Sequence, residues 1–382
     1  MDSYAVCLAT PEQDAEARKR ESVEWGVGMT LEQFSEREDM LDSQPFARNG
    51  DGGRRRWVLV PKGDEETLDF LAACETYRRK IMIRHPENEI PVTAISYSIA
   101  SVFVPAQKRR KGYAAMLMKL LHGQIQPASP PSIGIVEETG RYGKDGILSF
   151  LFSDVGKFYE PLGWHVNKAD QLEWGMQAII SAKAPSTTAV TEADIPALAT
   201  ADESVLRQEI AQPAPRHLGG PQAVRFTLSD PQGLAWRWSI ARSKFYASRA
   251  GRSPTVWGAR VEGLSNAFAV WAYNYQPNTL ELIFLRLRFS SREELLALVA
   301  AARAAASKEG LKRIVAWNVD LVAAGVADAE NPTVADAERL TSELAGANLV
   351  TRTSKSLPCI AWYGAEHGGK VDWIACEKGW WC

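Results

Sequence analysis

The sequence predicts an α+β protein of two domains, and three observations carry this prediction. The chain has 382 residues, which is more than a single core usually supports. Strand patterns and helical patterns are mixed along both halves of the chain. The polar stretch of small residues from Ala182 to Asp194 has the composition of a linker. We therefore expect domains at 1–183 and 195–382, joined by a linker at 184–194.

In the first half, cap and turn signals set the expected elements. Thr10 can cap a helix that has Pro11 at its first position, and Thr30 can cap a second helix. The long strand pattern at 92–104 stops at Pro105 and is followed by helical spacing at 112–125. The other expected elements are strands at 4–9, 56–60 and 147–152, one or two strands within 68–83, a helix at 157–159, a strand after Trp164, a turn at 49–53 and a surface excursion at 127–145.

The second half is rich in tryptophan, since nine of the 13 tryptophans follow residue 230. A well-packed domain is the favoured interpretation, and a special aromatic site is the alternative. The stretch 280–319 repeats the strand, turn, helix and strand of the first half, so the second domain is either a degenerate copy of the first or an unrelated α+β domain. The expected elements are helices ending near 210 and spanning 236–246 and 290–310, strands at 257–258, 267–275, 280–288 and 313–319, and short strands within 355–382.

Composition argues against several classes of function. The net charge of −2 and the pI of about 6.3 do not favour binding to nucleic acid or to an anionic membrane. The five cysteines show no CxxC spacing, and the five histidines show no metal-ligand spacing, so we expect no metal. With no signal-peptide pattern and no apolar run of spanning length, we expect a cytoplasmic protein.

The segment from Val102 to Ala114 has the chemistry of an anion site. Gly112 allows a backbone to approach a ligand closely, and the following helix offers unpaired N–H groups and a positive dipole end. Four basic residues, Lys108 to Lys111, surround the turn. The pattern matches neither a Walker A loop nor GxGxxG, so the residues themselves indicate a phosphate site of unspecified kind.

Two motifs, in order, give this segment a more specific meaning. Arg109 to Ala114 matches the signature R/Q-x-x-G-x-G/A, and Tyr159 to Trp164 matches Y-x-x-x-G-F/W after a buried strand. Over residues 1–180 the chain resembles the GNAT superfamily of N-acetyltransferases, with Ala114 in place of the commoner second glycine. The resemblance implies a central mixed, mainly antiparallel sheet flanked by helices.

More narrowly, the chain resembles the fungal lysine N-acetyltransferase-like group. Three segments carry this resemblance: Ala72–Thr76, Phe152–Tyr159 and the closing Glu377–Cys382. The resemblance to this group reaches the C-terminus but is looser than the match to the superfamily. It implies a lysine side chain as one possible acceptor.

The superfamily resemblance also implies roles for single residues, with acetyl-CoA as cosubstrate. Val102, Phe103 and Val104 would pair with the pantetheine arm, and the amides of Arg109, Arg110, Lys111, Gly112, Tyr113 and Ala114 would bind the pyrophosphate. Ser153 would touch the pantetheine arm, although a plain N-cap is the favoured reading of this residue. Tyr159 would protonate the leaving CoA thiolate, and its alternative is a core tyrosine.

Removing a proton from the amine needs a further group. Glu75 lies in an otherwise apolar run, where a carboxylate without a purpose would be costly, so it is our candidate for the base. The alternative is an edge-strand or salt-bridged Glu75, with Arg78 and Arg79 close by. Ser96, Ser98 and Ser101 could instead order water molecules.

Together these features predict direct acetyl transfer from acetyl-CoA to a small-molecule primary amine, with the second domain shaping the acceptor site. A first alternative is an acetyltransferase that detoxifies a toxin or secondary metabolite. A second is a non-catalytic, regulatory CoA-binding module. The sequence leaves the oligomeric state open.

Overall fold

The computed structural model describes residues 3–48, 53–88, 90–127, 142–176, 185–264, 266–276, 279–326, 339, 341–364 and 370–381. The chain divides into two compact units. The first unit comprises 1–81, 92–167 and 354–366, and the second comprises 82–91, 168–353 and 367–382. The structure contains a nine-stranded sheet and a seven-stranded sheet among the described residues.

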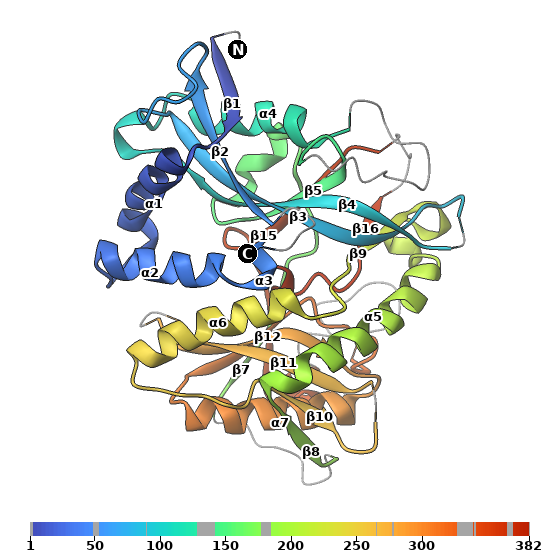
Figure 1. The fold of residues 1–382 in the computed structure, drawn as a ribbon. Coiled ribbons are helices and arrows are strands. Elements are labelled where there is room, and N and C mark those ends of the chain that lie inside the picture. The colour runs from blue at the N-terminus through green and yellow to red at the C-terminus, as the bar shows by residue number, and fades with distance from the viewer. Residues whose placement is uncertain are drawn as a thin grey trace. The chain divides into compact units, whose positions relative to one another are not determined.

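The first unit has a mixed sheet whose strand order is β1-β2-β3-β4-β5-β15-β6 (Figure 1). The strands are β1 (Tyr4–Leu8), β2 (Arg54–Pro61), β3 (Ala72–Arg84, whose last three residues belong to the second unit), β4 (Val92–Phe103), β5 (Gly146–Ser153), β6 (His165–Val166) and β15 (Leu357–Trp362). The helices are α1 (Pro11–Trp25), α2 (Leu31–Asp42), α3 (Pro45–Arg48) and α4 (Tyr113–Ile125), with the 3₁₀ helices η1 (Ala106–Lys108) and η2 (Gly156–Leu162).

Local sequence explains where the first helices begin. The hydroxyls of Thr10 and Thr30 accept hydrogen bonds from the backbone N–H groups of Gln13 and Gln33, and each glutamine side chain bonds back to its cap. Helix α1 then buries Ala17 against Val58, Val60 and Ala73 of the sheet and against Phe70, which precedes β3. These caps confirm the helix starts that the sequence predicts.

The parallel strands β4 and β5 pair over only part of their length. Pairing runs from Ile95–Gly146 to Ile99–Leu151, although β4 continues to Phe103 and β5 to Ser153. Just past the last pair, Ser101 has a positive φ of 52°, which breaks the regular pleat of β4. The two strands therefore do not pair with each other toward their C-terminal ends, beside the turn that leads into α4.

The second unit has a sheet with the strand order β14-β7-β13-β12-β11-β10-β8. Helices α6 and α7 lie on opposite faces of this sheet (Figure 1). The strands are β7 (Asp170–Gly175), β8 (Thr187–Val190), β10 (Gly258–Val261), β11 (Phe268–Asn274), β12 (Glu281–Arg288), β13 (Arg313–Trp317) and β14 (Ala347–Thr351), with a parallel pair of β9 (Val224–Leu228) and β16 (Val371–Trp373). The helices are α5 (Ile195–Ala211), α6 (Leu234–Arg249) and α7 (Arg292–Lys308), with the 3₁₀ helices η3 (Glu192–Asp194), η4 (Arg216–Leu218), η5 (Gly220–Gln222) and η6 (Lys378–Trp380).

The tryptophans of the second unit serve its core. Trp174, Trp236, Trp257 and Trp271 are among the largest fully buried side chains. This packing agrees with the favoured interpretation of a well-packed domain.

The structure divides the chain differently from the expected boundaries at 183 and 195. β7 pairs with β13 and β14, so 170–175 belong to the second sheet. β8, inside the expected linker, pairs with β10. β15 pairs with β5 and β6, so a segment near the C-terminus completes the first sheet. Periodicity identifies a strand, but the choice of sheet depends on long-range pairing that the pattern does not encode.

Two smaller expectations also need correction. The helix expected at 157–159 is the 3₁₀ helix η2, and Pro161 lies inside it. The region 68–83 contributes a single strand that begins at Ala72. Residues 49–52 of the expected turn and 128–141 of the expected surface excursion lie outside the described residues.

Candidate active site

The turn between β4 and α4 presents backbone N–H groups to one side. Arg110 and Gly112 both have positive φ, 65° and 81°, with Lys111 between them. Alternation of backbone handedness turns successive N–H groups toward a common concavity that suits an anion. Gly112 is the N-cap of α4 and supplies no side-chain cap, so the first N–H groups of the helix remain available.

The basic side chains of this turn are partly committed to the protein itself. Lys108 forms an ion pair with Asp69 at 2.6 Å. Arg109 pairs with Glu24 and donates to the carbonyl of Val104 at 3.0 Å. Arg110 and Lys111 are exposed. An anion at this turn would therefore meet the backbone N–H groups of the turn more than its basic side chains.

Replacing Gly112 by valine is expected to weaken acetyl-CoA binding at least tenfold. A β-branched residue does not adopt a φ of 81° without strain, so the turn would reset and its N–H groups would no longer converge. Isothermal titration of both proteins with acetyl-CoA measures the effect.

Gly123→Ala is the matched control in the same helix. A Cβ at Gly123 meets no atom within 4 Å, and this residue lacks a positive φ. The change should leave affinity unaltered and stabilise the fold by about 0.4–1 kcal/mol. Unchanged affinity in Gly112→Val would remove this turn from the cofactor site.

The opening between β4 and β5 is the second part of the site. Of the expected pantetheine residues, Val102 and Phe103 lie at the end of β4 that does not pair with β5, and Val104 directly follows the strand. Phe103 is buried. An extended ligand could add to this free edge as another strand would. Ser153 does not share that role: its hydroxyl donates to the carbonyl of Gly156 at 2.7 Å and accepts from the N–H of Val155 at 3.2 Å. It holds the turn after β5 and does not cap η2, whose N-cap residue is Val155.

Tyr159 lies in η2 and is almost completely buried, with 8% of its surface exposed. Burial raises the pKa of its phenol, and the neighbouring thiols of Cys74 and Cys359 add to this effect. The phenol therefore stays protonated at neutral pH, which is the state required of a general acid. Among the described residues, no hydrogen bond engages its hydroxyl, so the proton is not committed to another protein group.

Glu75 is held in a buried ionic cluster. Its Oε1 accepts from Arg54 Nε at 2.8 Å and from Arg56 Nη2 at 2.7 Å, and its Oε2 accepts from Ser101 Oγ at 3.0 Å. Burial alone would raise the pKa of Glu75, but the two guanidinium groups outweigh it and bring the pKa to about 2.

This geometry argues against Glu75 as the amine base. Both carboxylate oxygens are engaged, and a carboxylate with so low a pKa is a poor proton acceptor. The salt-bridged alternative describes it better, although the partners are Arg54 and Arg56, whereas Arg78 pairs with Asp145 at 2.7 Å. The register of β2 against β3 sets Arg56 opposite Glu75.

The serines proposed to order water are also engaged. Ser96 Oγ donates to the carbonyl of Arg79 at 3.2 Å, and Ser101 Oγ donates to Glu75. Ser98 is 1% exposed. The base therefore stays unassigned.

Sequence reasoning missed the contribution of β15 and of His122. β15 brings Cys359 and Tyr363 next to β5, more than 200 positions away in the chain. His122 of α4 bonds to Tyr363 and to the carbonyl of Leu162. The spacing of His122 after the buried Leu121 gave no signal beyond ordinary helix packing.

The second unit repeats the strand–helix–strand arrangement of the first, but its C-terminal segment closes the opening between the two parallel strands. β12, α7 and β13 repeat β4, α4 and β5, and β12 pairs in parallel with β13 only from Glu281–Arg313 to Ile283–Val315. Beyond that point the chain's own C-terminal segment bridges the strands. Glu377 Oε2 accepts from the N–H of Leu287 at 2.8 Å, and Asn318 Nδ2 donates to the carbonyl of Cys376 at 2.6 Å.

The start of α7 also differs from the start of α4. Ser291 caps the helix by accepting from the N–H of Glu294, and the first turn carries Glu293 and Glu294. A filled N-terminus with two carboxylates repels a phosphate. The second unit therefore has the topology of a degenerate copy, without an open counterpart of the phosphate site.

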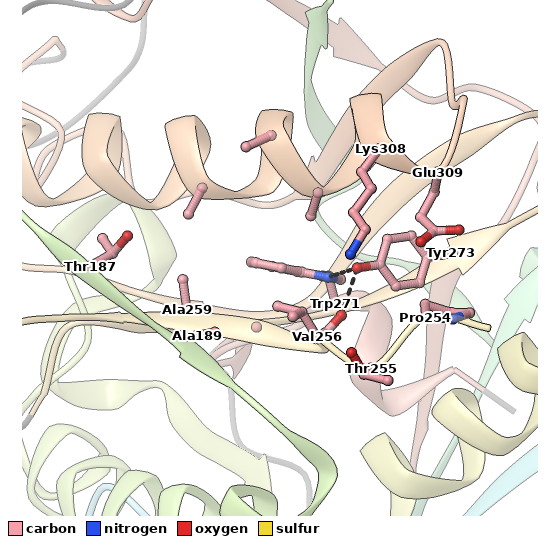
Figure 2. A pocket seen from close by; sticks show the side chains of 14 residues that line it. Thr187, Ala189, Pro254, Thr255, Val256, Ala259, Trp271, Tyr273, Lys308 and Glu309 are labelled. Atoms are coloured by element: carbon pink, nitrogen blue, oxygen red, sulfur yellow. Dashed lines mark hydrogen bonds between the residues drawn. The ribbon is translucent and has the colours of Figure 1, made fainter. Parts of the chain in front are cut away.

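The second unit does contain a cavity of about 330 Å³ (Figure 2). Trp271 Nε1 donates to the hydroxyl of Tyr273 at 2.9 Å, which donates to the carbonyl of Val256 at 2.6 Å. Lys308 and Glu309 of the α7 end line the same space (Figure 2). Much of the remaining lining is small: Ala189, Gly258, Ala259, Ala301, Ala304 and Ala305. The cavity can accept an apolar group. The N–H of Trp271 and the hydroxyl of Tyr273 already have hydrogen-bond partners within the protein.

In the described parts of the chain, no group of three or more histidine, cysteine or acidic side chains could hold a metal ion. No described helix is long and apolar enough to cross a bilayer.

Together, these features define a class. Two parallel strands that separate beside a glycine-containing phosphate turn, with a buried tyrosine after the second strand, are the features of a GNAT N-acetyltransferase. A family model described as the LYC1 GNAT-like C-terminal domain matches residues 171–382. The chain belongs to this family of GNAT proteins.

Similar proteins agree with this assignment. The chain is 26% identical over 346 residues to a protein from Yarrowia lipolytica (strain CLIB 122 / E 150) named lysine acetyltransferase, covering 81% of this chain and 83% of the relative. A probable N-acyltransferase from Enterococcus faecalis V583 superposes with a TM-score of 0.52 at 12% identity, covering 95% of this chain and 73% of that one. A GCN5-related N-acetyltransferase from Anabaena variabilis ATCC 29413 gives 0.51 at 11% identity, with coverage of 94% and 72%. The two solved structures support the fold.

Proposed function

We propose that the first unit transfers the acetyl group of acetyl-CoA directly to a primary amine of a small molecule. The observation that carries this proposal is the opening between β4 and β5, which meets the phosphate turn at one end of β4. An extended cofactor with a pyrophosphate and two amides fits a free strand edge that leads to converging N–H groups. Acetyl-CoA has this chemistry.

The proposed reaction needs no covalent enzyme intermediate. The amine nitrogen attacks the thioester carbonyl, a C–N bond forms, and the oxyanion is stabilised by backbone N–H groups of β4. The C–S bond then breaks, and the thiolate takes a proton from Tyr159. The nitrogen loses its surplus proton, which restores the phenol by way of solvent.

We favour the lysine side chain as acceptor because the Yarrowia relative is named a lysine acetyltransferase. The counterpart of the cofactor opening in the second unit is closed by the C-terminal segment, so we assign cofactor binding to the first unit alone. This assignment also predicts one molecule of acetyl-CoA for each chain.

A thiol-release assay over a panel of amines tests the proposal, with calorimetry of acetyl-CoA binding in parallel. The panel contains L-lysine, ornithine and spermidine, with norleucine as the matched compound that lacks the side-chain amine. We expect release with L-lysine, none with norleucine, and a stoichiometry near one. Tight binding without release for any amine would support a regulatory CoA-binding module instead.

A further inference from the structure

A chain of hydrogen bonds lies behind the tyrosine-bearing turn η2. Trp164 Nε1 donates to Ser149 Oγ at 2.9 Å, and Ser149 Oγ lies 2.6 Å from the hydroxyl of Tyr363. The Tyr363 hydroxyl lies 2.8 Å from His122 Nδ1, and His122 Nε2 lies 2.8 Å from the carbonyl of Leu162. The chain thus connects β5, β15, α4 and η2 within the first unit.

The chemistry of the end groups fixes the direction of every bond. A carbonyl only accepts, so His122 must carry its proton on Nε2. In the neutral ring Nδ1 then accepts from Tyr363, Tyr363 accepts from Ser149, and Ser149 accepts from Trp164. All donors are used. A protonated His122 would donate from Nδ1 to Tyr363, and the proton of either the Tyr363 or the Ser149 hydroxyl would then have no acceptor within this chain of hydrogen bonds.

The motif from Tyr159 to Trp164 is explained by its contacts with His122. The ring of His122 stacks on Trp164, with centroids 3.9 Å apart and an interplanar angle of 18°. Gly163 has a φ of 101°, and a Cβ there would lie 3.3 Å from His122 Nε2. The glycine and tryptophan that follow Tyr159 are therefore the residues against which His122 is seated.

The contacts of His122 act on η2, which carries Tyr159, the proposed acid. Trp164 N–H donates to the carbonyl of Tyr159 at 3.1 Å, so the backbone of Tyr159 is tied to the residue on which His122 stacks. No hydrogen bond among the described residues holds the Tyr159 hydroxyl directly, so its place is set by η2. His122 lies in the last turn of α4, and the first turn of the same helix follows the turn at Gly112.

We propose that His122 is a positioning residue that fixes Tyr159 relative to the cofactor-binding helix α4. The proposal rests on the proposed acetyl transfer, because it assigns Tyr159 the role of acid. It acts through geometry: an acid displaced by about 1 Å from the leaving sulfur loses much of its effect. The burial of His122, which lowers the pKa of its imidazole, agrees with a neutral ring.

A double-mutant cycle tests this role. His122→Phe keeps an aromatic ring beside Trp164 but loses both hydrogen bonds, and we expect about a tenfold lower kcat with unchanged affinity for acetyl-CoA. In a Tyr159→Phe background the same change should have no further effect. His122→Gln, which retains an N–H for Leu162, should recover most of the rate, and the exposed His165→Gln should match the unsubstituted protein. Equal losses in both backgrounds, or no loss in either, would overturn the proposal.

A second measurement does not depend on turnover. Nitrogen NMR of histidine-labelled protein, assigned with His122→Gln, should show His122 neutral with its proton on Nε2 at pH 7, and Tyr363→Phe should shift this signal. A proton on Nδ1, or a charged ring, would overturn the hydrogen-bond chain. Failure of the proposed function would appear differently, as an absence of acetyl transfer by the unsubstituted protein.

Discussion

Tyr159→Phe is expected to lower kcat about 10²-fold while the affinity for acetyl-CoA stays unchanged. The phenylalanine fills the same buried space, so the loss reports the missing proton donor and little else. Burial, together with the nearby thiols, raises the pKa of Tyr159 and keeps the acid protonated through the neutral range. The CoA thiolate would then have to leave without a proton, or take one from water.

Steady-state kinetics with the preferred amine measures the change in kcat, and calorimetry measures the affinity for acetyl-CoA separately. Tyr246→Phe on α6 removes a tyrosine hydroxyl from the other unit and serves as the control. Equal rates for Tyr159→Phe and the unsubstituted protein would leave Tyr159 with a packing role alone. The inference about His122 would lose its basis with it.

Glu75→Gln is expected to reduce the free energy of unfolding by about 1–3 kcal/mol. The substitution keeps the shape of the side chain but removes one of the carboxylates that Arg54 and Arg56 share, in a cluster where Glu75 is 4% exposed. Arg54 keeps its ion pair with Asp14, and Arg56 keeps its ion pair with Glu21, so the expected cost is that of weakened buried hydrogen bonds. The amount of thermally or chemically unfolded protein should rise, whereas turnover per folded molecule should change little.

Urea unfolding measures the loss, and pH provides an internal check. The folded pKa of Glu75, about 2, lies below its ordinary value of 4.5, so its charge stabilises the fold above pH 4.5. This contribution disappears as the pH falls toward 2, and the difference between the two proteins should shrink in that window. Asp39→Asn is the control, because Asp39 pairs with Arg18 at 71% exposure and should cost less than about 1 kcal/mol. A stable Glu75→Gln with sharply lower turnover would restore the role of amine base.

The sequence allowed the local parts of the site to be predicted. The strand before Pro105, the turn around Gly112 and the helix after it follow from contiguous patterns, and the structure has β4, the turn and α4 there. Tyr159 was identified by its motif, since the motif records a turn that a glycine at 163 makes possible. The caps at Thr10 and Thr30 were equally local.

The role of Glu75 could not be predicted in the same way. The cost of an unpaired carboxylate in an apolar run correctly indicated a partner. Which arginines supply it depends on the register of β2 against β3, and residues 19 and 21 positions away come into contact only when those strands pair. The neighbouring Arg78 and Arg79, close in sequence, lie elsewhere.

By itself the sequence determined the local elements of the candidate site, because the turn at Gly112 and the motif from Tyr159 to Trp164 are each built from residues adjacent in the chain. Only the tertiary structure decided which distant segments pack beside those elements and which segment closes the opening in the second unit. It placed β15 beside β5, joined His122 to the turn of Tyr159, and seated Glu377 against β12 in the second unit. Strand pairing and burial act between segments that are distant in sequence, and no local pattern of residues records which partner each edge will find.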